Sequence, residues 1–465
     1  MTHRKYPSGT LSRRGMLKGT GATGLAFGLI GFEARPARAA PSRGGTFRVG
    51  VHDGNSTDSW DPATTASIMM IHSSHVCRAY LTEITNEDTL GPDLATDWQA
   101  TKDDASEWRF ELARNATFHD GRAVTAKDVI ASINYHRGPD STSAVAPLLG
   151  DITDIRADGD NAVIFALSSG NADLPYLMSD YHLVIQPATE DGGIEWKNGI
   201  GCGPYKLTGF EAGIRATYAR HDGWHRADSG AWFDAIDMTV LNDANARQTA
   251  IVTGDVDAVT DIDLKTADLL ARAPGVLLDD VPSGTHITMP MFCDVAPFDD
   301  VNVRLALKYA IDRQEIVDKI LFGRGTIAND QPIGPTMPYH ADLPQREQDL
   351  DKARFHLKKA GHDRLPVEIF VADTVISGAT NMCTLFAEQA RPAGLDIKVN
   401  QQPADGYWTN IWLKKPFCVV SWTARPTPDV MFSLAYKAGA DWNESHWENE
   451  RFNELLVKAK SELNQ

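Results

Sequence analysis

The chain has 465 residues, a formal net charge of −17 and five cysteines without a C-x-x-C pair. This length exceeds what one compact core usually accommodates, so two or more lobes are expected. The acidic balance argues against nucleic acid or anionic lipid as a partner, because both need a basic patch. The scattered cysteines give little support for a zinc or iron–sulfur site, and they leave either one disulfide or only small buried thiols as readings.

The first 39 residues have the features of a cleaved export signal. Arg13 and Arg14 in "SRRGMLKG" precede an uncharged run from Gly19 to Phe32, and the segment ends in "ARAA". The run is shorter than the roughly 20 apolar residues that span a bilayer. Small residues at the exit predict cleavage between Ala39 and Ala40. The segment resembles a twin-arginine (Tat) signal, which implies export of a folded protein to a bacterial periplasm; an uncleaved amphipathic leader is the alternative.

The first half of the mature chain is predicted to be rich in strands. Alternating apolar residues predict strands in "GTFRVGV" (45–51), "EWRFEL" (107–112) and "NAVIFAL" (161–167). A hairpin is expected over 204–220, where two such runs flank a glycine-containing turn. The segment 245–260 predicts a helix that ends at Gly254 and a short strand after it.

The second half changes to an α/β pattern after about residues 281–298. Apolar spacing in "VNVRLALKYAIDRQEIVDKILFG" predicts one helical face over 301–323 that ends at Gly323. The segment 366–400 reads as strand, helix and strand, a unit that closes onto a parallel sheet. The change of pattern marks the expected lobe boundary, with Gly284 as a hinge residue.

Histidine motifs offer weak support for chemistry. His119 and Asp120 in "FHDG" could serve a metal or act as a general base, but a turn with Gly121 at positive φ is the stronger interpretation. His72 and His75 have i, i+3 spacing without a nearby acidic residue. No familiar catalytic motif is present. We therefore expect no enzyme activity, catalytic residue, metal site or cofactor, with a periplasmic hydrolase or metalloprotein as the alternative.

Aromatic residues crowd positions 407–447 near the C-terminal end, in segments that also contain Pro, Asp and Asn. Core strands and helices do not usually interleave tryptophans with "ARPTPD" or "GADWNESH". Loops with aromatic and charged side chains commonly hold ligands. A ligand-facing role and a core role both stay open for this cluster, which comprises Tyr407, Trp408, Trp412, Trp422, Trp442 and Trp447.

Five stretches in order resemble the solute-binding proteins of peptide-type ABC importers, the dipeptide- and oligopeptide-binding family known as solute-binding protein family 5. The resemblance runs from about Gly45 to the end of the chain. The stretches are "DLATDW" (93–98), "FHDGRAVTAKDV" (118–129), "IGCGPYKL" (200–207), "GDVDAV" (254–259) and "PFDDVNVRLALKYAIDRQEIV" (297–317).

The resemblance implies an α/β fold of two lobes, with an extra β-rich subdomain on the first lobe. Lobe I is expected over 40–284, with the subdomain at about 76–199, and lobe II over 285–465. The family's final helix and returning strand are missing from this pattern, so a truncated chain is expected. The implied function is capture of a peptide, peptide-like or opine-like solute in the periplasm and delivery to a membrane permease. We expect a monomer that binds no nucleic acid.

One departure concerns the ligand. In members that bind free peptides, an acidic residue in a "W-x-x-D" segment pairs with the terminal ammonium group of the peptide. In this chain "WTAR" places Arg425 at that position. A guanidinium repels an ammonium group, so Arg425 is expected to receive an anionic group. The alternative is a surface pair between Arg425 and Asp429. The expected ligand-binding residues are Arg425, Trp422, Trp408, Tyr407, Trp442, Asn55 and Asp294.

Overall fold

A computed structural model of the chain describes residues 42–86, 89–139, 141–281, 283–335, 337 and 339–460. The expected export signal lies outside these residues. Within them, no helix is both long enough and apolar enough to cross a membrane.

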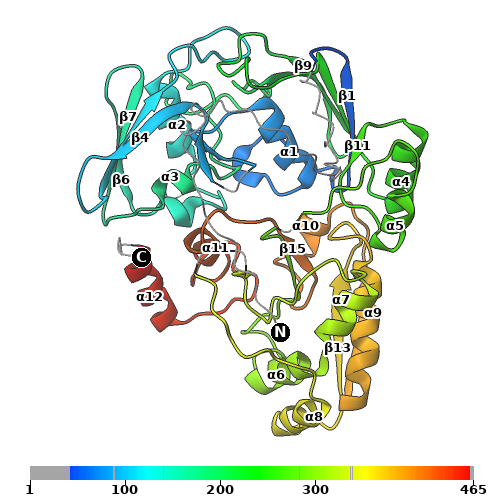
Figure 1. Ribbon diagram of the computed structural model, residues 1–465. Helices are drawn as coiled ribbons and strands as arrows, with labels where there is room; N and C mark the ends of the chain where they lie inside the picture. The colour runs from blue at the N-terminus through cyan, green and yellow to red at the C-terminus, as the bar shows by residue number, and fades with distance from the viewer. Residues whose placement is uncertain are drawn as a thin grey trace, which may run out of the picture. The chain divides into compact units, whose positions relative to one another are not determined.

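A five-stranded sheet contains the first strand of the described chain (Figure 1). Its order is β11-β1-β10-β9-β8, with β1 parallel to β10 and β11, and β9 antiparallel to β10 and β8. The predicted first strand and hairpin are confirmed. The strands are β1 (Thr46–Val51), β8 (Tyr205–Glu211), β9 (Arg215–Arg220), β10 (Ala235–Val240) and β11 (Ala258–Val259).

A second sheet of four antiparallel strands has the order β4-β5-β7-β6. Buried Phe110, Val163 and Phe165 share a core with Val129 and Ile133 of helix α2 (Ala126–Tyr135). Its strands are β4 (Ala95–Ala100), β5 (Glu107–Leu112), β6 (Ile152–Ala157) and β7 (Ala162–Leu167), and a small hairpin beside it pairs β2 (Thr82–Ile84) with β3 (Leu90–Pro92).

The predicted strand–helix–strand unit of the second half is also present. Strands β13 (Leu365–Val371) and β14 (Leu395–Gln401) pair in parallel, and α9 (Ala379–Ala390) connects them along β13 (Figure 1). Buried Ile369 and Val371 share a core with Met382 and Phe386 of α9. Burial alternates along β13, so Val367, Ile369 and Val371 lie on the face that packs into this core.

The single helix predicted over 301–323 is wrong. Two helices form instead, α6 (Val301–Ala310) and α7 (Arg313–Lys319). Ile311 and Asp312 between them are extended, and the Asp312 carboxylate accepts a hydrogen bond from the backbone N–H of Glu315 at 2.9 Å. This N-cap begins a new helix in the middle of a continuous apolar pattern. Gly323 lies beyond α7, with φ of 74°.

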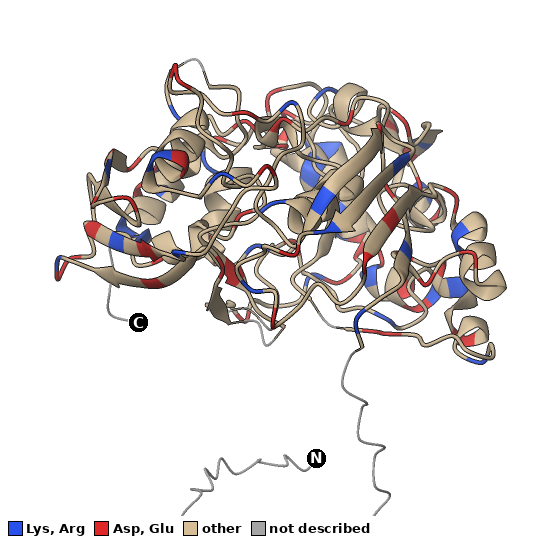
Figure 2. Ribbon diagram, turned by 90° about the horizontal axis from the view of Figure 1, so that it is seen from above, with Lys and Arg blue, Asp and Glu red and all other residues tan. Residues whose placement is uncertain are grey.

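The remaining elements connect these sheets. Two further strands, β12 (His286–Thr288) and β15 (Val420–Trp422), pair antiparallel, so that His286 lies opposite Trp422. Figure 2 shows acidic and basic residues interspersed over the elements. The other helices are α1 (Ile68–Cys77), α3 (Leu174–Leu177), α4 (Ala244–Thr253), α5 (Ala267–Leu270), α8 (Leu350–Lys359), α10 (Tyr407–Asn410), α11 (Pro428–Ala435) and α12 (Glu450–Lys460), with short 3-10 turns at 62–64, 146–149, 264–266 and 391–393.

Candidate functional site

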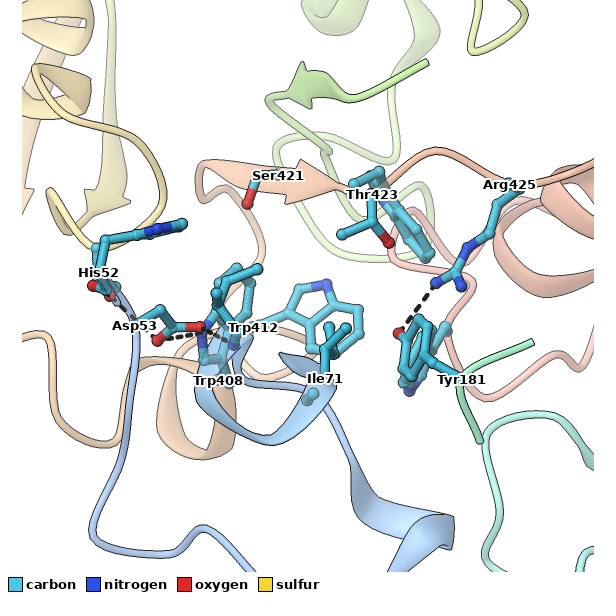
Figure 3. Close-up of a pocket in the computed structure, with 14 residues that line it drawn as sticks. His52, Asp53, Ile71, Tyr181, Trp408, Trp412, Ser421, Thr423 and Arg425 are labelled. Atoms are coloured by element: carbon cyan, nitrogen blue, oxygen red, sulfur yellow. Dashed lines mark hydrogen bonds between the residues drawn. The ribbon is translucent and has the colours of Figure 1, made fainter. Parts of the chain in front are cut away.

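A pocket with about 490 Å³ of empty space, part of it open to solvent, is lined by residues from both halves of the chain (Figure 3). Its walls are mostly aromatic and apolar, with a few polar groups, as is usual for sites that bind small molecules. The first half contributes His52, Asp53, Ala66, Ile68, Ile71 and Tyr181, and the second half contributes Thr374, Trp408, Trp412, Ser421, Trp422, Thr423, Arg425 and Trp442.

The ends of two strands supply much of this lining. β1 ends at Val51, so His52 and Asp53 leave the sheet edge directly into the pocket. β15 carries Ser421 and Trp422, and the chain continues through Thr423 to Arg425. Figure 3 places His52 and Asp53 at one end of the pocket and Tyr181 and Arg425 at the other.

Asp53 ties the two halves of the chain together. Its buried carboxylate accepts hydrogen bonds from the indole Nε1 of Trp408 (3.0 and 3.1 Å) and the hydroxyl of Thr374 (3.1 Å). The backbone N–H of Ile68 (3.0 Å) and the Asn55 amide (3.3 Å) also donate to it. Burial raises the pKa of Asp53, and these hydrogen bonds oppose that rise. Every group bonded to this carboxylate is a neutral donor.

A second buried carboxylate fixes two further indole rings. Glu444 accepts hydrogen bonds from Trp412 Nε1 and Trp422 Nε1, both at 3.0 Å, and from the Thr288 hydroxyl at 2.8 Å. Burial raises the pKa of Glu444, and the three donors oppose that rise. Since their N–H groups are occupied, Trp412 and Trp422 present ring surface to the pocket.

The indole rings form one packed cluster. The ring centroid of Trp412 lies 5.7 Å from that of Trp408, 6.0 Å from that of Trp422 and 5.1 Å from that of Trp442. The steep interplanar angles, between 61° and 90°, are those of edge-to-face packing. The cluster makes a rigid apolar wall.

Arg425 closes the other end of the pocket. Its side chain is only 3% exposed; Nη1 lies 3.3 Å from Asp180 Oδ2, and Nη2 donates to the Tyr181 hydroxyl at 3.2 Å. The guanidinium carbon lies 5.0 Å from the ring centroid of Tyr181 and 5.8 Å from those of Trp422 and Trp442. A guanidinium enclosed by aromatic faces is held by cation–π attraction as well as by hydrogen bonds.

Asp180 is shared between Arg425 and His182. The carboxylate Oδ1 lies 2.6 Å from His182 Nδ1 and accepts the backbone N–H of the same residue at 3.0 Å. His182 Nε2 donates to the carbonyl oxygen of Thr65 at 3.0 Å. Burial alone would raise the pKa of Asp180, but the charge and hydrogen bonds of His182 and the charge of Arg425 lower it.

The structure brings four of the seven expected ligand-binding residues into this pocket: Arg425, Trp422, Trp408 and Trp442. Asn55 lies behind it, where its amide bridges Asp53 and the backbone N–H of Gly406. Tyr407 is not in the lining, because its ring is fully buried and its hydroxyl lies within 3.0 Å of the carbonyl oxygens of Phe370 and Val419. Asp294 is exposed and pairs with His446 at 2.8 Å.

The alternative pairing of Arg425 with Asp429 is wrong. Arg425 is buried against Asp180, whereas the Asp429 carboxylate lies 3.6 Å from Nζ of Lys460 at the end of α12. Asp429 also accepts a hydrogen bond from the Ser433 hydroxyl at 3.2 Å. The arginine therefore belongs to the pocket and not to the surface of α11.

The two histidine motifs lie in a turn and in a helix. The predicted turn at "FHDG" is confirmed, since the Gly121 N–H donates to the Phe118 carbonyl at 2.9 Å and Gly121 has φ of 91°. His72 and His75 both lie on α1. Within the described ranges, no group of three or more His, Cys, Asp or Glu residues could hold a metal ion. All five cysteines, each of which is described, are free thiols, and four of them are buried.

Several residues of the site are marked by no pattern in the sequence. His52, Asp53 and Tyr181 line the pocket, and Asp180 and Glu444 orient its side chains. Tyr181 meets Arg425 across 244 positions of the chain, so no local pattern could join them. Two signals in the sequence pointed to this place, the clustered tryptophans and the arginine in "WTAR".

Comparisons with the sequences of known proteins agree on one family. Residues 89–444 match the model of the bacterial extracellular solute-binding proteins, family 5, middle region. A probable peptide ABC transporter periplasmic-binding protein of Sinorhizobium fredii is 25% identical over 432 residues, which cover 86% of this chain and 77% of that protein. The oligopeptide-binding protein of Bacillus subtilis is 26% identical over 70% of this chain and 61% of its own length.

Solved structures of periplasmic binding proteins have the same fold as this chain. A periplasmic binding protein from A. tumefaciens R10 in complex with agropinic acid has a TM-score of 0.80 and 22% identity, and the match covers 90% of this chain and 87% of that one. An ABC transporter-associated periplasmic binding protein of Helicobacter pylori, in complex with the peptide STSA, has a TM-score of 0.80 and 21% identity, and the match covers 91% of this chain and 88% of that one.

Proposed function

Because the chain belongs to family 5 of the bacterial extracellular solute-binding proteins, we propose that it captures a small solute in the pocket described above and delivers it to the permease of an ABC importer. Its fold is the two-lobed α/β fold of periplasmic binding proteins, as predicted. The family consists of transport binding proteins and not of enzymes. We extend this to the present chain and propose that it returns its solute chemically unchanged.

The observation that carries this proposal is the composition of the pocket from both halves of the chain. Asp53 and Tyr181 of the first half face Trp408, Trp412 and Arg425 of the second. A solute held there contacts both halves at once, so its binding energy favours the arrangement in which they are closed together. We propose that the halves correspond to lobes with a boundary near Gly284.

Finer points of the proposal rest on sequence features and on relatives. The arginine pair and the small-residue exit support twin-arginine export and cleavage before Ala40, and the relatives' periplasmic location supports the periplasm as the destination. Relatives whose names or structures include oligopeptides and agropinic acid support a peptide-like or opine-like solute. We propose that the protein acts as a monomer.

A thermal-shift screen over peptides, opines, polyamines and sugars tests this function. A solute that binds only the folded state stabilises it by about 2.7 kcal/mol at a hundredfold excess over its dissociation constant. The bound compound is then recovered and identified by mass spectrometry. Recovery of the intact compound supports the proposal, and its conversion into a product contradicts it in favour of a hydrolase.

A further inference from the structure

Arg425 has hydrogen-bonding capacity that the protein does not use. A guanidinium has five N–H donors, and the structure gives it one bond to Asp180 and one to Tyr181. Its Nε is buried and has no partner among the described residues. Because a buried, unpaired donor is costly, this group is prepared for an acceptor that the protein itself does not supply.

The charge of Arg425 is also not balanced, although Asp180 lies beside it. A carbonyl oxygen only accepts, so His182 Nε2, 3.0 Å from the Thr65 carbonyl, carries a proton. A second proton must lie between His182 Nδ1 and Asp180 Oδ1, since two acceptors 2.6 Å apart would repel. With these two protons the Asp180–His182 pair has no net charge, whichever atom holds the shared one. Arg425 is left with a positive charge at the pocket wall.

The carboxylates of the site already accept hydrogen bonds from the protein, so none of them is free to pair with a cationic group of a ligand. Asp53 already accepts from Trp408, Thr374, Ile68 and Asn55. Glu444 is occupied by Trp412, Trp422 and Thr288. The two oxygens of Asp180 are taken by His182 and Arg425. An ammonium group would enter this pocket without a free carboxylate to pair with.

The rest of the pocket sets the body and the direction of the ligand. Between the two charged ends lies the face of the tryptophan cluster, together with Ile71. These surfaces suit an apolar or planar body. The negative charge of Asp53 at the opposite end disfavours an anion there, so an anionic group is directed to Arg425 (Figure 3).

We infer that the pocket selects a small carboxylic acid that lacks an ammonium group, with its carboxylate on Arg425 and its body on the tryptophan cluster. This inference rests on the proposed function and adds the chemical class of the solute. It distinguishes the pocket from one that binds the free amino terminus of a peptide, which needs an unoccupied carboxylate.

The test is calorimetric titration and thermal shift of the full mature chain with probes that share one body. One set is phenylacetate, phenylacetamide and phenethylamine; the other is N-acetyl-dialanine, its amide, and dialanine amide. A wider panel of metabolite acids and amines of similar size follows. The expected result is that acids bind at least tenfold more tightly than their amides and that the amines do not bind. Stronger binding of amines or amides, or failure of every acid to bind, overturns the inference.

Two variants and a matched control locate the charge. Arg425→Ala is expected to weaken the tightest acid at least tenfold, and Arg425→Lys at least threefold, since lysine reproduces bidentate geometry poorly. Arg364→Ala removes an arginine whose exposed side chain pairs with Asp396 and should leave binding unchanged. If Arg425→Ala fails to fold, the lysine variant and the wild-type probe series still decide.

The two proposals fail separately. An amine that binds and is recovered intact overturns the inference about the acid and leaves the transport function standing. An acid that binds through Arg425 but is converted into a product does the reverse.

Discussion

Three of the four pocket tryptophans have their indole N–H held by a buried carboxylate. Trp408 donates to Asp53, and Trp412 and Trp422 donate to Glu444. The hydrogen bonds decide which surface of each ring meets the solute. Glu444 therefore acts as a positioning residue that shapes the pocket from behind.

Glu444→Gln tests this role. The amide replaces one acceptor oxygen by a donor, so at least one of Thr288, Trp412 and Trp422 loses its acceptor. The free energy of unfolding should fall by about 1–3 kcal/mol, and the emission of the pocket tryptophans should shift. The control Glu388→Gln changes an exposed pair with Arg391 and should cost less than about 0.5 kcal/mol. Equal effects of both variants in urea unfolding contradict the account.

His136 provides a prediction about pH. It is buried, Nδ1 lies 2.6 Å from the Ser143 hydroxyl, and burial lowers its pKa to about 3. An unfolded histidine has a pKa of about 6.5, so the unfolded state binds the proton more readily as pH falls through this interval. The contribution of His136 to the free energy of unfolding is therefore largest above the unfolded pKa and is lost as the pH falls toward 3. About 2 kcal/mol of it is lost between pH 7 and pH 5.

His136→Gln removes the titrating group and with it this pH-dependent contribution to stability. Urea unfolding of both proteins at several pH values should show a shallower loss of stability for the variant between pH 7 and 5. Parallel curves for the two proteins would show that His136 is protonated equally in the folded and unfolded states.

Residue identity alone predicted only part of the site. The departure at Arg425 and the clustered tryptophans were visible in the sequence, and four of these residues line the pocket. No local pattern in the sequence marks Asp180, Tyr181 or Asp53, because each of them bonds to a site residue more than 200 positions away along the chain. Tyr407 and Trp408 are adjacent, yet the first is core and the second lines the pocket, since neighbouring side chains of α10 point in different directions.

At the scale of elements, hydrophobic periodicity and the positions of glycines predicted about half of the described strands. β1, β5, β7, the β8–β9 hairpin and the β13–α9–β14 unit all lie where alternation and glycines place them. The break between α6 and α7 was missed because the apolar spacing continues across it. Asp312 has two readings in a sequence, an interior residue or an N-cap, and its hydrogen bond to Glu315 decides between them.

Gly254 tests the end of α4. It has φ of 77°, in the left-handed region, and a Cβ there would meet no atom within 4 Å. Gly254→Ala should therefore cost about 1 kcal/mol from backbone strain alone. Gly334 is a matched control, because its surroundings are equally open and its φ is not positive. Gly334→Ala should be neutral or slightly stabilising; equal thermal midpoints for the two variants contradict this reading of the cap.

At the scale of the whole molecule, several hydrogen bonds join the two halves beside the pocket. Ser56 donates to Asp405 at 2.9 Å, Thr374 to Asp53 at 3.1 Å, and Arg247 to Ser377 at 3.0 Å. Water can replace these hydrogen bonds when the halves separate, whereas Val430 and Leu434 of α11 are buried in the apolar core of the first half. The solute then supplies the difference in free energy that favours closure.

Small-angle scattering tests this coupling. A saturating solute from the thermal-shift screen should lower the radius of gyration of the wild-type protein. At a concentration just sufficient to saturate the wild type, Arg425→Ala should become less compact than the wild type does, because the variant binds at least tenfold more weakly. An identical radius with and without solute at saturation counts against closure about a hinge near Gly284.

The most direct test of the central claim is a crystal structure of the protein saturated with the acid that binds most tightly. We predict intact solute in the pocket, with its carboxylate on Arg425 and its body against Trp412 and Trp422. Density for the solute elsewhere on the protein, or for a reaction product in the pocket, would contradict it.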